Sequence, residues 1–409
     1  MVPNGWKYST TSEVLMKVSN PVDVDASSYY REIGIRSHGK GIFHKKPILG
    51  KEIGNKRVFH IEPGCFVVNI VFAWEQAVAK TTDEELGMIA SHRFPMFKPK
   101  DDRCNIDFIL YFFKTKKGKS LLELASPGGA GRNKTLGQSE FAKLSLLLPS
   151  IEEQEKIAKI LSTWDKAITT SEKLLTNCRQ QKKILMQQLL SGKKRLLDKH
   201  GGRFSGEWVE VSLNKMAEVI VSPVDKKTEP NETPVELCNY TDVYYNRLIT
   251  RKINFMKATA TKSEVAKYTL QQGDIVITKD SETPGDIAVP ALVSEDLKGV
   301  VCGYHLAIVR PHTKYIDGAF LNYLFSMQKT RYYFFTLATG ATRFGLSVGA
   351  INRAHFRIPD VKEQQKIAAV LSSADQEITT LQQKLDALKQ EKSALMQQLL
   401  TGKRRVTLN

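Results

Sequence analysis

Two stretches of the sequence decide the fold, because one is a copy of the other. The first, residues 148–170, reads LPSIEEQEKIAKILSTWDKAITT, and the second, residues 358–380, reads IPDVKEQQKIAAVLSSADQEITT. Further on, LMQQLLSGKKR (185–195) returns as LMQQLLTGKRR (395–405), again 210 positions later and without a gap. A repeat of this length indicates a chain built as two halves of one plan.

Each copied stretch carries the start and stop signals of one long helix. Ser150 and Asp360 suit the N-cap position, and each is followed three residues later by a glutamate, as in a capping box. Gly192 and Gly402 suit the position just beyond a helix C-terminus. We therefore predict two helices of nearly equal length.

Apolar residues recur along both stretches in alternating steps of four and three, which is typical of a coiled coil. The seam positions are Ile157, Leu161, Trp164, Ile168, Leu175, Leu185 and Leu189 in the first copy, and Ile367, Leu371, Ile378, Leu385, Leu388, Leu395 and Leu399 in the second. Lys182 and Lys392 occupy matching seam positions, where they either fix the register or reach solvent along their apolar stems. We expect the two helices to pair antiparallel, since the second domain begins near the end of the first helix. The alternative is an amphipathic helix packed on each domain.

Outside the helices the two copies share little more than a few residues at the boundaries of predicted strands and turns. Trp6 reappears as Trp208, and MFKP (96–99) resembles IVRP (308–311). Runs rich in β-forming residues predict strands at Phe66–Phe72, Asp107–Phe113, Asp274–Thr278 and Gly299–Val309. A helix is expected near Phe320–Phe325.

These patterns together predict an α+β fold. We expect two mixed α/β domains, at residues 1–147 and 196–357, separated by an antiparallel two-helix coiled coil formed by residues 148–195 and 358–405. A pseudo-twofold axis is expected to relate the two halves, as in an isologous dimer fused into one chain.

The charge points to a polyanionic partner. The chain has 60 Lys and Arg against 43 Asp and Glu, a net charge of +17, which favours double-stranded DNA or another nucleic acid. The five cysteines are far apart and form no C-x-x-C pair, so neither a zinc site nor a disulfide framework is indicated. No apolar run reaches membrane-spanning length, and the first residues lack the pattern of a signal peptide. We expect a cytoplasmic protein with no membrane partner and no bound metal.

Basic residues mixed with aromatic and small polar residues mark candidate DNA contacts, because such side chains suit phosphates and base edges. The candidates lie in predicted loops after strands or at matched positions in the two copies. In the first domain they are Arg36, Ser37, His38, Lys40, Arg132, Asn133 and Lys134; in the second they are Lys226, Lys227, Lys279, Ser281, Arg343 and Ser347.

Catalytic motifs are incomplete. GGAGRNKT (128–135) lacks the glycine that a phosphate-binding loop needs before its lysine. GDIVITKD (273–280) offers Asp274 and Lys279 but no second well-placed carboxylate, so a stand-alone nuclease is the weaker hypothesis. We expect no catalytic residue and no cofactor on this chain.

The helix motifs LPSIEEQEKIAKILS and IPDVKEQQKIAAVLS, each ending in QQLL-Ser/Thr-Gly-Lys, resemble those of the specificity (S) subunit of type I restriction–modification systems, the HsdS family. IGIRSHGKGIF (33–43), LCNYTDVY (237–244) and CGYHLAIVRP (302–311) also resemble its recognition domains, and the resemblance covers nearly the whole chain.

The resemblance implies that each domain reads one half of a bipartite, asymmetric DNA site while the helices fix the spacer. It further implies two methyltransferase (M) subunits carrying S-adenosylmethionine, usually methylating adenine, and restriction/translocase (R) subunits using ATP and Mg²⁺. Because the two domains differ strongly, their half-sites should differ. The alternative from another class is a coiled-coil scaffolding protein with incidental basic charge.

Overall fold

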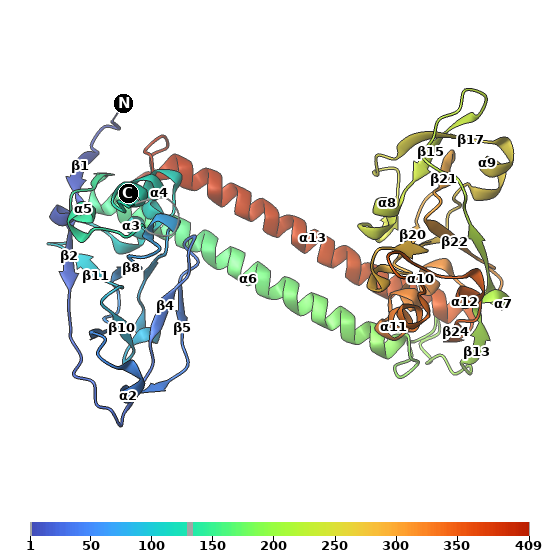
Figure 1. The fold of residues 1–409 in the computed structure, drawn as a ribbon, viewed down its shortest axis with the longest axis horizontal. Helices are drawn as coiled ribbons and strands as arrows, with labels where there is room; N and C mark the ends of the chain where they lie inside the picture. Colours follow the sequence, from blue (N-terminus) through green and yellow to red (C-terminus); the bar gives the residue numbers. More distant parts are fainter. Residues whose placement is uncertain (1, 129–133, 409) are drawn as a thin grey trace. The chain divides into compact units, whose positions relative to one another are not determined.

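The computed structural model describes residues 2–128 and 134–408, and the chain divides into two units (Figure 1). Unit 1 comprises Met1–Lys173 and Gln383–Asn409, and unit 2 comprises Leu174–Gln382. The long helices α6 (Ile151–Leu189) and α13 (Val361–Leu399) each contribute one part to each unit. Each unit therefore contains one folded domain and portions of both helices.

The domain of unit 1 is built on an antiparallel sheet with the strand order β2-β11-β8-β9. Its strands are β2 (Leu15–Val18), β11 (Met96–Pro99), β8 (Phe66–Val68) and β9 (Val78–Lys80). Two-stranded ribbons surround it: β1 (Lys7–Thr10) with β12 (Ser145–Leu148), β3 (Tyr29–Tyr30) with β6 (Ile48–Leu49), β4 (Ile33–Ile35) with β5 (Ile42–His44), and β7 (Val58–His60) with β10 (Ile89–Ser91). The helices are α1 (Thr11–Val14), α2 (Gly50–Ile53), α3 (Ile106–Phe113), α4 (Lys116–Leu124) and α5 (Gln138–Ala142), with short 3₁₀ turns η1 (Ala73–Glu75) and η2 (Asp83–Glu85).

The domain of unit 2 repeats this order and adds one strand, giving β14-β22-β18-β20-β16. These strands are β14 (Ala217–Val221), β22 (Leu306–Pro311), β18 (Ile275–Thr278), β20 (Pro290–Val293) and β16 (Leu248–Ile249). The remaining strands are β13 (Val209–Ser212) with β24 (His355–Ile358), β19 (Asp280–Ser281) with β23 (Phe344–Gly345), and β17 (Met256–Ala260), β15 (Thr233–Cys238) and β21 (Val300–Cys302) in a separate sheet. The helices are α7 (Leu213–Met216), α8 (Tyr240–Tyr244), α9 (Lys262–Tyr268), α10 (Gly318–Ser326), α11 (Gln328–Leu337) and α12 (Val348–Asn352), with the 3₁₀ turn η3 (Pro284–Asp286).

The predicted long helices are confirmed, and in each unit they run antiparallel. In unit 1, Lys392 lies 2.6 Å from Asp165, and Lys389 lies 2.7 Å from Glu172. In unit 2, Arg179 donates to Gln382 at 3.0 Å, and Lys182 pairs with Asp375. In both units the residue number rises along one helix as it falls along the other. The mixed α/β character of both domains is likewise confirmed.

The side chains at the predicted seam positions are buried to different degrees. Ile157, Leu161, Leu175, Leu189, Ile367, Leu371, Leu385 and Leu399 are buried, whereas Trp164, Ile168, Leu185, Ile378, Leu388 and Leu395 are partly buried. The ends of the helices also join the domain cores: Ile157 and Leu399 lie in the core of unit 1, and Leu189 and Ile367 lie in that of unit 2.

At the helix starts, the predicted N-cap residues are confirmed, but the predicted capping boxes are wrong. Ser150 and Asp360 do cap the helices, since each accepts a hydrogen bond from the backbone N–H three residues on, at 3.4 and 3.1 Å. The glutamate carboxylates, however, do not return to the cap residues. Glu363 instead accepts two hydrogen bonds from Arg195, both at 2.6 Å, and Glu153 accepts two from Arg405, at 2.7 and 2.8 Å. A buried carboxylate gains more from a bidentate guanidinium than from one backbone N–H.

Two glutamines join each helix start to its domain. The side-chain oxygen of Gln154 accepts from the backbone N–H of Asn105 at 3.0 Å, and that of Gln364 accepts from Asp317 N–H at 2.9 Å. Their amide nitrogens donate to the backbone carbonyls of Pro149 and Pro359 at 3.0 and 2.8 Å. These glutamines are buried, so their amides need such partners.

Trp6 and Trp208 match between the two copies because each packs beside the glycine at the end of a long helix. Gly402 and Gly192 have φ of +69° and +72°, and a Cβ on either would lie 3.3 or 3.2 Å from the indole of Trp6 or Trp208. Trp6 also packs edge-on against Phe108, and Trp208 against Phe320, with ring centres 6.5 and 6.4 Å apart. Each glycine thus lies at the end of its helix and makes room for an indole, that of Trp6 in the core of unit 1 and that of Trp208 against the core of unit 2.

One predicted strand is wrong: Asp107–Phe113 lies in the helix α3. Asn105 caps it by accepting from the backbone N–H of Phe108 at 3.0 Å. Ile106, Phe108, Ile109 and Phe112 are all buried, so the helix is apolar around most of its surface. A short apolar run of this kind has no periodicity that separates a buried helix from a buried strand. The predicted run Gly299–Val309 is two strands, β21 and β22, rather than one.

In the part of the chain that the structure describes, no helix has the length and apolarity needed to cross a membrane.

Candidate nucleic-acid interface

In unit 2, several sequence-predicted residues meet at one cavity of about 550 Å³. Helix α8, the turn between β18 and β20, and the segment between β21 and β22 form its walls. Three of the candidate DNA contacts, Lys226, Ser281 and Arg343, line it. The other lining side chains are largely aromatic or acidic: Tyr240, Thr241, Tyr244, Tyr245, Asp280, Glu282, Thr283, Asp286, Tyr304 and His305.

Hydrogen bonds hold the walls of this cavity together. Tyr240 and Tyr244 stack with ring centres 5.5 Å apart, and their hydroxyls reach Ser281 at 3.1 Å and Asp286 at 3.0 Å. The Thr278 hydroxyl donates to the Asp286 carbonyl at 2.6 Å, which fixes the 3₁₀ turn η3 at the end of β18. The tyrosine rings are therefore preorganised beside a polar turn.

The charges at the cavity mouth are mixed. Among the described residues, Arg343 has no hydrogen-bond or ion-pair partner, and its side chain is exposed. Lys279 and His305 both contact the Asp280 carboxylate, at 2.7 and 3.4 Å. Burial lowers the pKa of His305, and the nearby Arg343 lowers it further against the opposing effect of Asp280. The site thus holds an exposed guanidinium beside an imidazole whose charged form is disfavoured.

In unit 1, the corresponding turn between β8 and β9 is joined by the loop between β4 and β5. The Ser37 hydroxyl donates to the Glu75 carboxylate at 2.7 Å, and the backbone N–H of His38 donates to the Glu75 carbonyl at 2.6 Å. Arg36 lies over the Phe43 ring at 4.8 Å, and Lys134 lies over the Trp74 ring at 5.5 Å. Three candidates from two parts of the sequence, Ser37, His38 and Lys134, therefore contact one turn, while Arg36 and the exposed Lys40 lie on the same loop as the first two.

Both turns contain a residue other than glycine in the left-handed region. Gln76 has φ of 59° just after η1, and Ala288 has φ of 54° just after η3; His38, on the loop that joins the first turn, has φ of 61°. The Gln76 amide donates to the carbonyls of Phe113 and Thr115, at 2.9 and 3.2 Å. Such conformations cost free energy and persist where the surroundings fix them, often at binding sites.

The remaining candidates have other positions. Lys227 is largely exposed and lies 3.8 Å from Asp225. The Ser347 hydroxyl caps α12 by accepting from the backbone N–H of Ala350 at 3.1 Å. Arg132 and Asn133 lie outside the described residues.

The candidate residues chosen from the sequence did not include the aromatic side chains of these walls, although the segment LCNYTDVY (237–244) was noted for its resemblance to recognition domains. In unit 2 these are the tyrosines of α8 with Tyr304, and in unit 1 the indole of Trp74 and the amide of Gln76. The run YTDVYYNR (240–247) carried the available signal, because aromatic residues repeated among polar ones are unusual on an exposed short helix.

The nuclease hypothesis finds no support in this geometry. The Asp274 carboxylate is buried and accepts two hydrogen bonds from Arg310, at 2.9 and 2.8 Å, while Lys279 is paired with Asp280. Within residues 2–128 and 134–408, no group of three or more His, Cys, Asp or Glu side chains could hold a metal ion.

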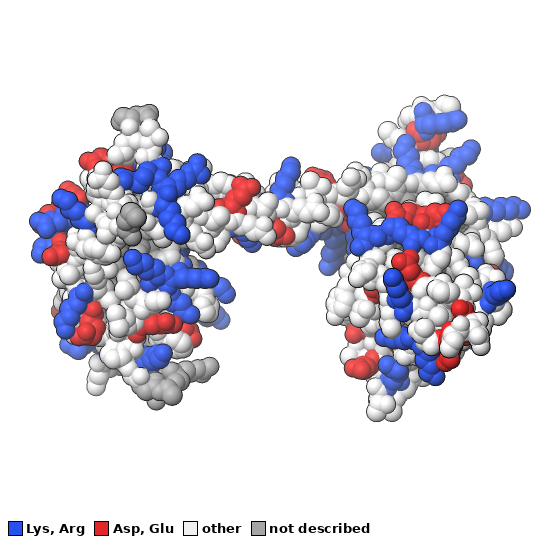
Figure 2. Space-filling view, turned by 90° about the horizontal axis from the view of Figure 1, so that it is seen from above, with Lys and Arg blue, Asp and Glu red and all other residues white. Residues whose placement is uncertain are grey.

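Figure 2 shows Lys and Arg side chains spread over the visible face of each unit, with acidic side chains between them. Such a surface suits contacts with phosphates at several points rather than one concentrated anion site.

Comparisons with known proteins agree with one another. A family model described as "Type I restriction modification DNA specificity domain" matches residues 66–177 and 205–390. The chain is 22% identical over 424 residues to the Type I restriction enzyme MjaVIII specificity subunit of Methanocaldococcus jannaschii, covering 99% of this chain and 94% of that one.

Two solved structures share the fold. The HsdS subunit of Thermoanaerobacter tengcongensis matches with a TM-score of 0.52 at 17% identity, over 98% of each chain. The S subunit from M. genitalium matches with a TM-score of 0.58 at 13% identity, over 100% of each.

Proposed function

Because the chain belongs to the family of type I restriction–modification DNA specificity proteins, we propose that each of its two units reads one half of a bipartite, asymmetric DNA site. Specificity subunits of these systems are non-catalytic, and catalysis belongs to their partners. We assign target recognition to residues 1–147 and 196–357, and the shared helical segments to residues 148–195 and 358–405.

One observation carries the proposal. Each unit places polar, cationic and aromatic side chains at the equivalent turn of its own sheet. The turn follows β8 in unit 1 and β18 in unit 2, and each contains a 3₁₀ turn and a left-handed residue. The side chains around the two turns are nevertheless different, with an indole in one and stacked tyrosines in the other. A shared scaffold with different contact residues is what two readers of different half-sites require.

The chemistry of these candidate cations fits DNA. Arg343 is the candidate for bidentate recognition of guanine in the major groove, since its guanidinium is exposed beside a preorganised pocket. Lys226 and Lys227, on the adjoining segment, are candidates for phosphate contacts, which position the protein without specifying sequence. Arg36 and Lys134 take these roles in unit 1, where aromatic rings orient both side chains.

The helices supply the second half of the proposed function. We propose that α6 and α13 set the unread spacer and recruit two methyltransferase subunits, to which restriction/translocase subunits then bind. S-adenosylmethionine, ATP and Mg²⁺ would be held by those partners. Two weak readers joined in one chain gain affinity only when their spacing matches both half-sites, which makes the spacer part of the specificity.

A binding experiment tests the proposal directly. The full chain, co-expressed with the methyltransferase encoded beside it, is incubated with a library of DNA duplexes containing two randomised blocks at variable separation. We expect enrichment of one split sequence with one spacer length, and a steep loss of affinity with added salt. No selected sequence, or self-assembly that salt does not affect, would favour the scaffolding alternative.

A further inference from the structure

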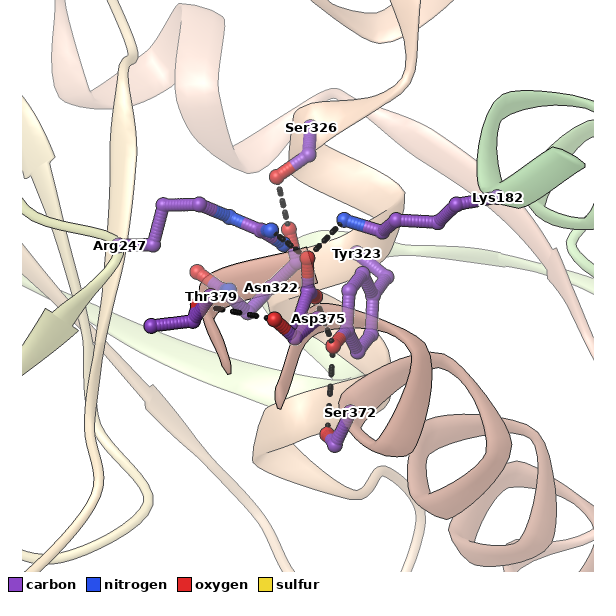
Figure 3. Close-up of polar contacts among 8 residues, drawn as sticks. All are labelled: Lys182, Arg247, Asn322, Tyr323, Ser326, Ser372, Asp375 and Thr379. Atoms are coloured by element: carbon purple, nitrogen blue, oxygen red, sulfur yellow. Dashed lines mark hydrogen bonds and ion pairs between the residues drawn. The ribbon is translucent and has the colours of Figure 1, made fainter. Parts of the chain in front are cut away.

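A single carboxylate in unit 2 joins both helices to two parts of the recognition domain. Asp375 of α13 accepts a hydrogen bond from the Tyr323 hydroxyl of α10 at 2.7 Å. Lys182 of α6 and Arg247, which follows α8, reach the same carboxylate from opposite sides (Figure 3). Both cations also lie near the face of the Tyr323 ring, 5.6 and 5.7 Å from its centre.

Unit 1 repeats part of this arrangement, with one cation on the carboxylate instead of two. Asp165 accepts from the Tyr111 hydroxyl at 2.7 Å and from Lys392 at 2.6 Å. Lys392 and Lys114 lie 5.3 and 5.9 Å from the centre of the Tyr111 ring. The aspartate, the tyrosine and the seam lysine are therefore repeated between units.

The second cation differs between the units, and in each it leads to the candidate reading elements. Arg247 lies three residues beyond Tyr244, which lines the cavity, and its backbone carbonyl accepts from Leu292 at 3.0 Å. Lys114 lies under the loop that carries Arg36 and Lys40: a Cβ on Gly39 would be 2.9 Å from Lys114 Cγ. Two unrelated cations thus connect the repeated cluster to two unrelated reading loops.

Electrostatics explains why the connection depends on the carboxylate. Burial alone would raise the pKa of Asp375, but hydrogen bonds from Arg247 and Lys182 hold that pKa below its usual value. Burial lowers the pKa of Lys182, and Arg247 lowers it further, while Asp375 opposes both effects. Without the negative charge, two neighbouring cations would repel each other, and the more exposed Arg247 would be the one to move.

We infer that Asp375 and Asp165 are positioning residues for DNA recognition. Asp375 holds the reading element of unit 2 directly through Arg247, and Asp165 holds that of unit 1 through Tyr111, whose ring faces Lys114. The base preference of each half-site therefore depends on a carboxylate of the helix pair that need not touch DNA. This inference rests on the proposed function, and it adds residues that composition and motifs do not reveal.

The repeat supplies a matched pair of variants. Asp375→Asn and Asp165→Asn are each made in the full chain with its methyltransferase partner, and discrimination against single-base changes is measured separately in each half-site. We expect Asp375→Asn to reduce discrimination about tenfold in the second half-site, the size of one lost base contact, and to leave the first unchanged. Asp165→Asn should show the reverse pattern.

Two further variants separate positioning from folding. Arg247→Met keeps the pair between Lys182 and Asp375 and should reproduce the loss in the second half-site, whereas Arg247→Lys should retain most of the discrimination. Combining Arg247→Met with Asp375→Asn should add little to either alone, because both remove the same link. If Asp375→Asn does not fold, Arg247→Met alone decides.

Equal loss at both half-sites, or weaker binding to every sequence with discrimination unchanged, would overturn the inference and leave the proposed function standing. An unmodified chain that selects no sequence would instead overturn the proposed function, and the inference with it.

Discussion

Replacing Glu363 by glutamine tests whether the ion pairs at the helix starts stabilise each unit. The Glu363 side chain is fully buried, while its partner Arg195 is 21% exposed. Breaking a buried ion pair costs about 3–5 kcal/mol, because the remaining charge loses its partner without regaining water. Glutamine keeps one acceptor oxygen, so we expect a loss of about 3 kcal/mol in unit 2.

The repeat provides an internal comparison. Glu153 is equally buried in unit 1, but Arg405 is 44% exposed and can be solvated when its partner is lost. Glu153→Gln should therefore cost about 1–2 kcal/mol. The double variant Glu363→Leu with Arg195→Met should recover most of the stability, since removing both charges leaves neither buried alone.

Native-state hydrogen exchange measures the effect unit by unit, which a single unfolding curve of a two-unit chain cannot do. Amides in the first turns of α13 and in β24 should exchange roughly a hundredfold faster in Glu363→Gln, and the matching amides of unit 1 should not change. Equal losses for the two single variants, or a loss under about 1 kcal/mol for Glu363→Gln, would refute the reasoning.

Further predictions concern recognition, spacing and pH. Arg343→Ala should cost about 1–3 kcal/mol of discrimination in the second half-site only, and Arg36→Ala the same in the first; in competition binding, a uniform loss over all sequences would instead identify a phosphate contact. Inserting one heptad into both α6 and α13 should change the selected spacer in the duplex library and leave the half-sites unaltered; an unmoved spacer would remove the helices' proposed role. Because the folded pKa of His305 is lowered, the folded state disfavours its charged form, so the stability of unit 2 should fall as pH drops below about 6.5. His305→Gln should reduce the loss of unit 2 stability with falling pH, measured by hydrogen exchange. An unchanged slope would show that His305 does not cause this loss.

The helices could be predicted from the sequence because their signals are local. Cap, heptad and terminal glycine lie within one continuous segment, and the repeat supplies each signal twice. Glu153 and Glu363 mark the limit of such signals: their spacing fits a capping box, but their partners Arg405 and Arg195 lie 252 and 168 positions away. Nothing local distinguishes a glutamate that caps from one that pairs with a distant arginine.

The candidate sites were predicted less completely for the same reason. The Ser37 and Lys134 candidates meet Glu75 and Trp74, which the sequence did not single out, because the β8–β9 turn lies far from both in the chain. Polar composition identified the loops, whereas their aromatic partners resembled ordinary core residues. The segment of α3 was wrongly predicted as a strand because eight mostly apolar residues fit the burial pattern of either a buried helix or a buried strand.

The buried glutamines at the helix starts have a consequence for how such a chain can evolve. Gln154 and Gln364 hold their domains through backbone atoms, those of Asn105 and Asp317 among them, so these particular contacts impose no side chain on the domain. A domain that keeps its main-chain path, and the tyrosine that bonds the aspartate of its helix, can therefore change its other contact residues without disturbing this docking. If each unit reads its own half-site, as proposed, a new DNA specificity can arise in one half of the protein while the other half is inherited intact.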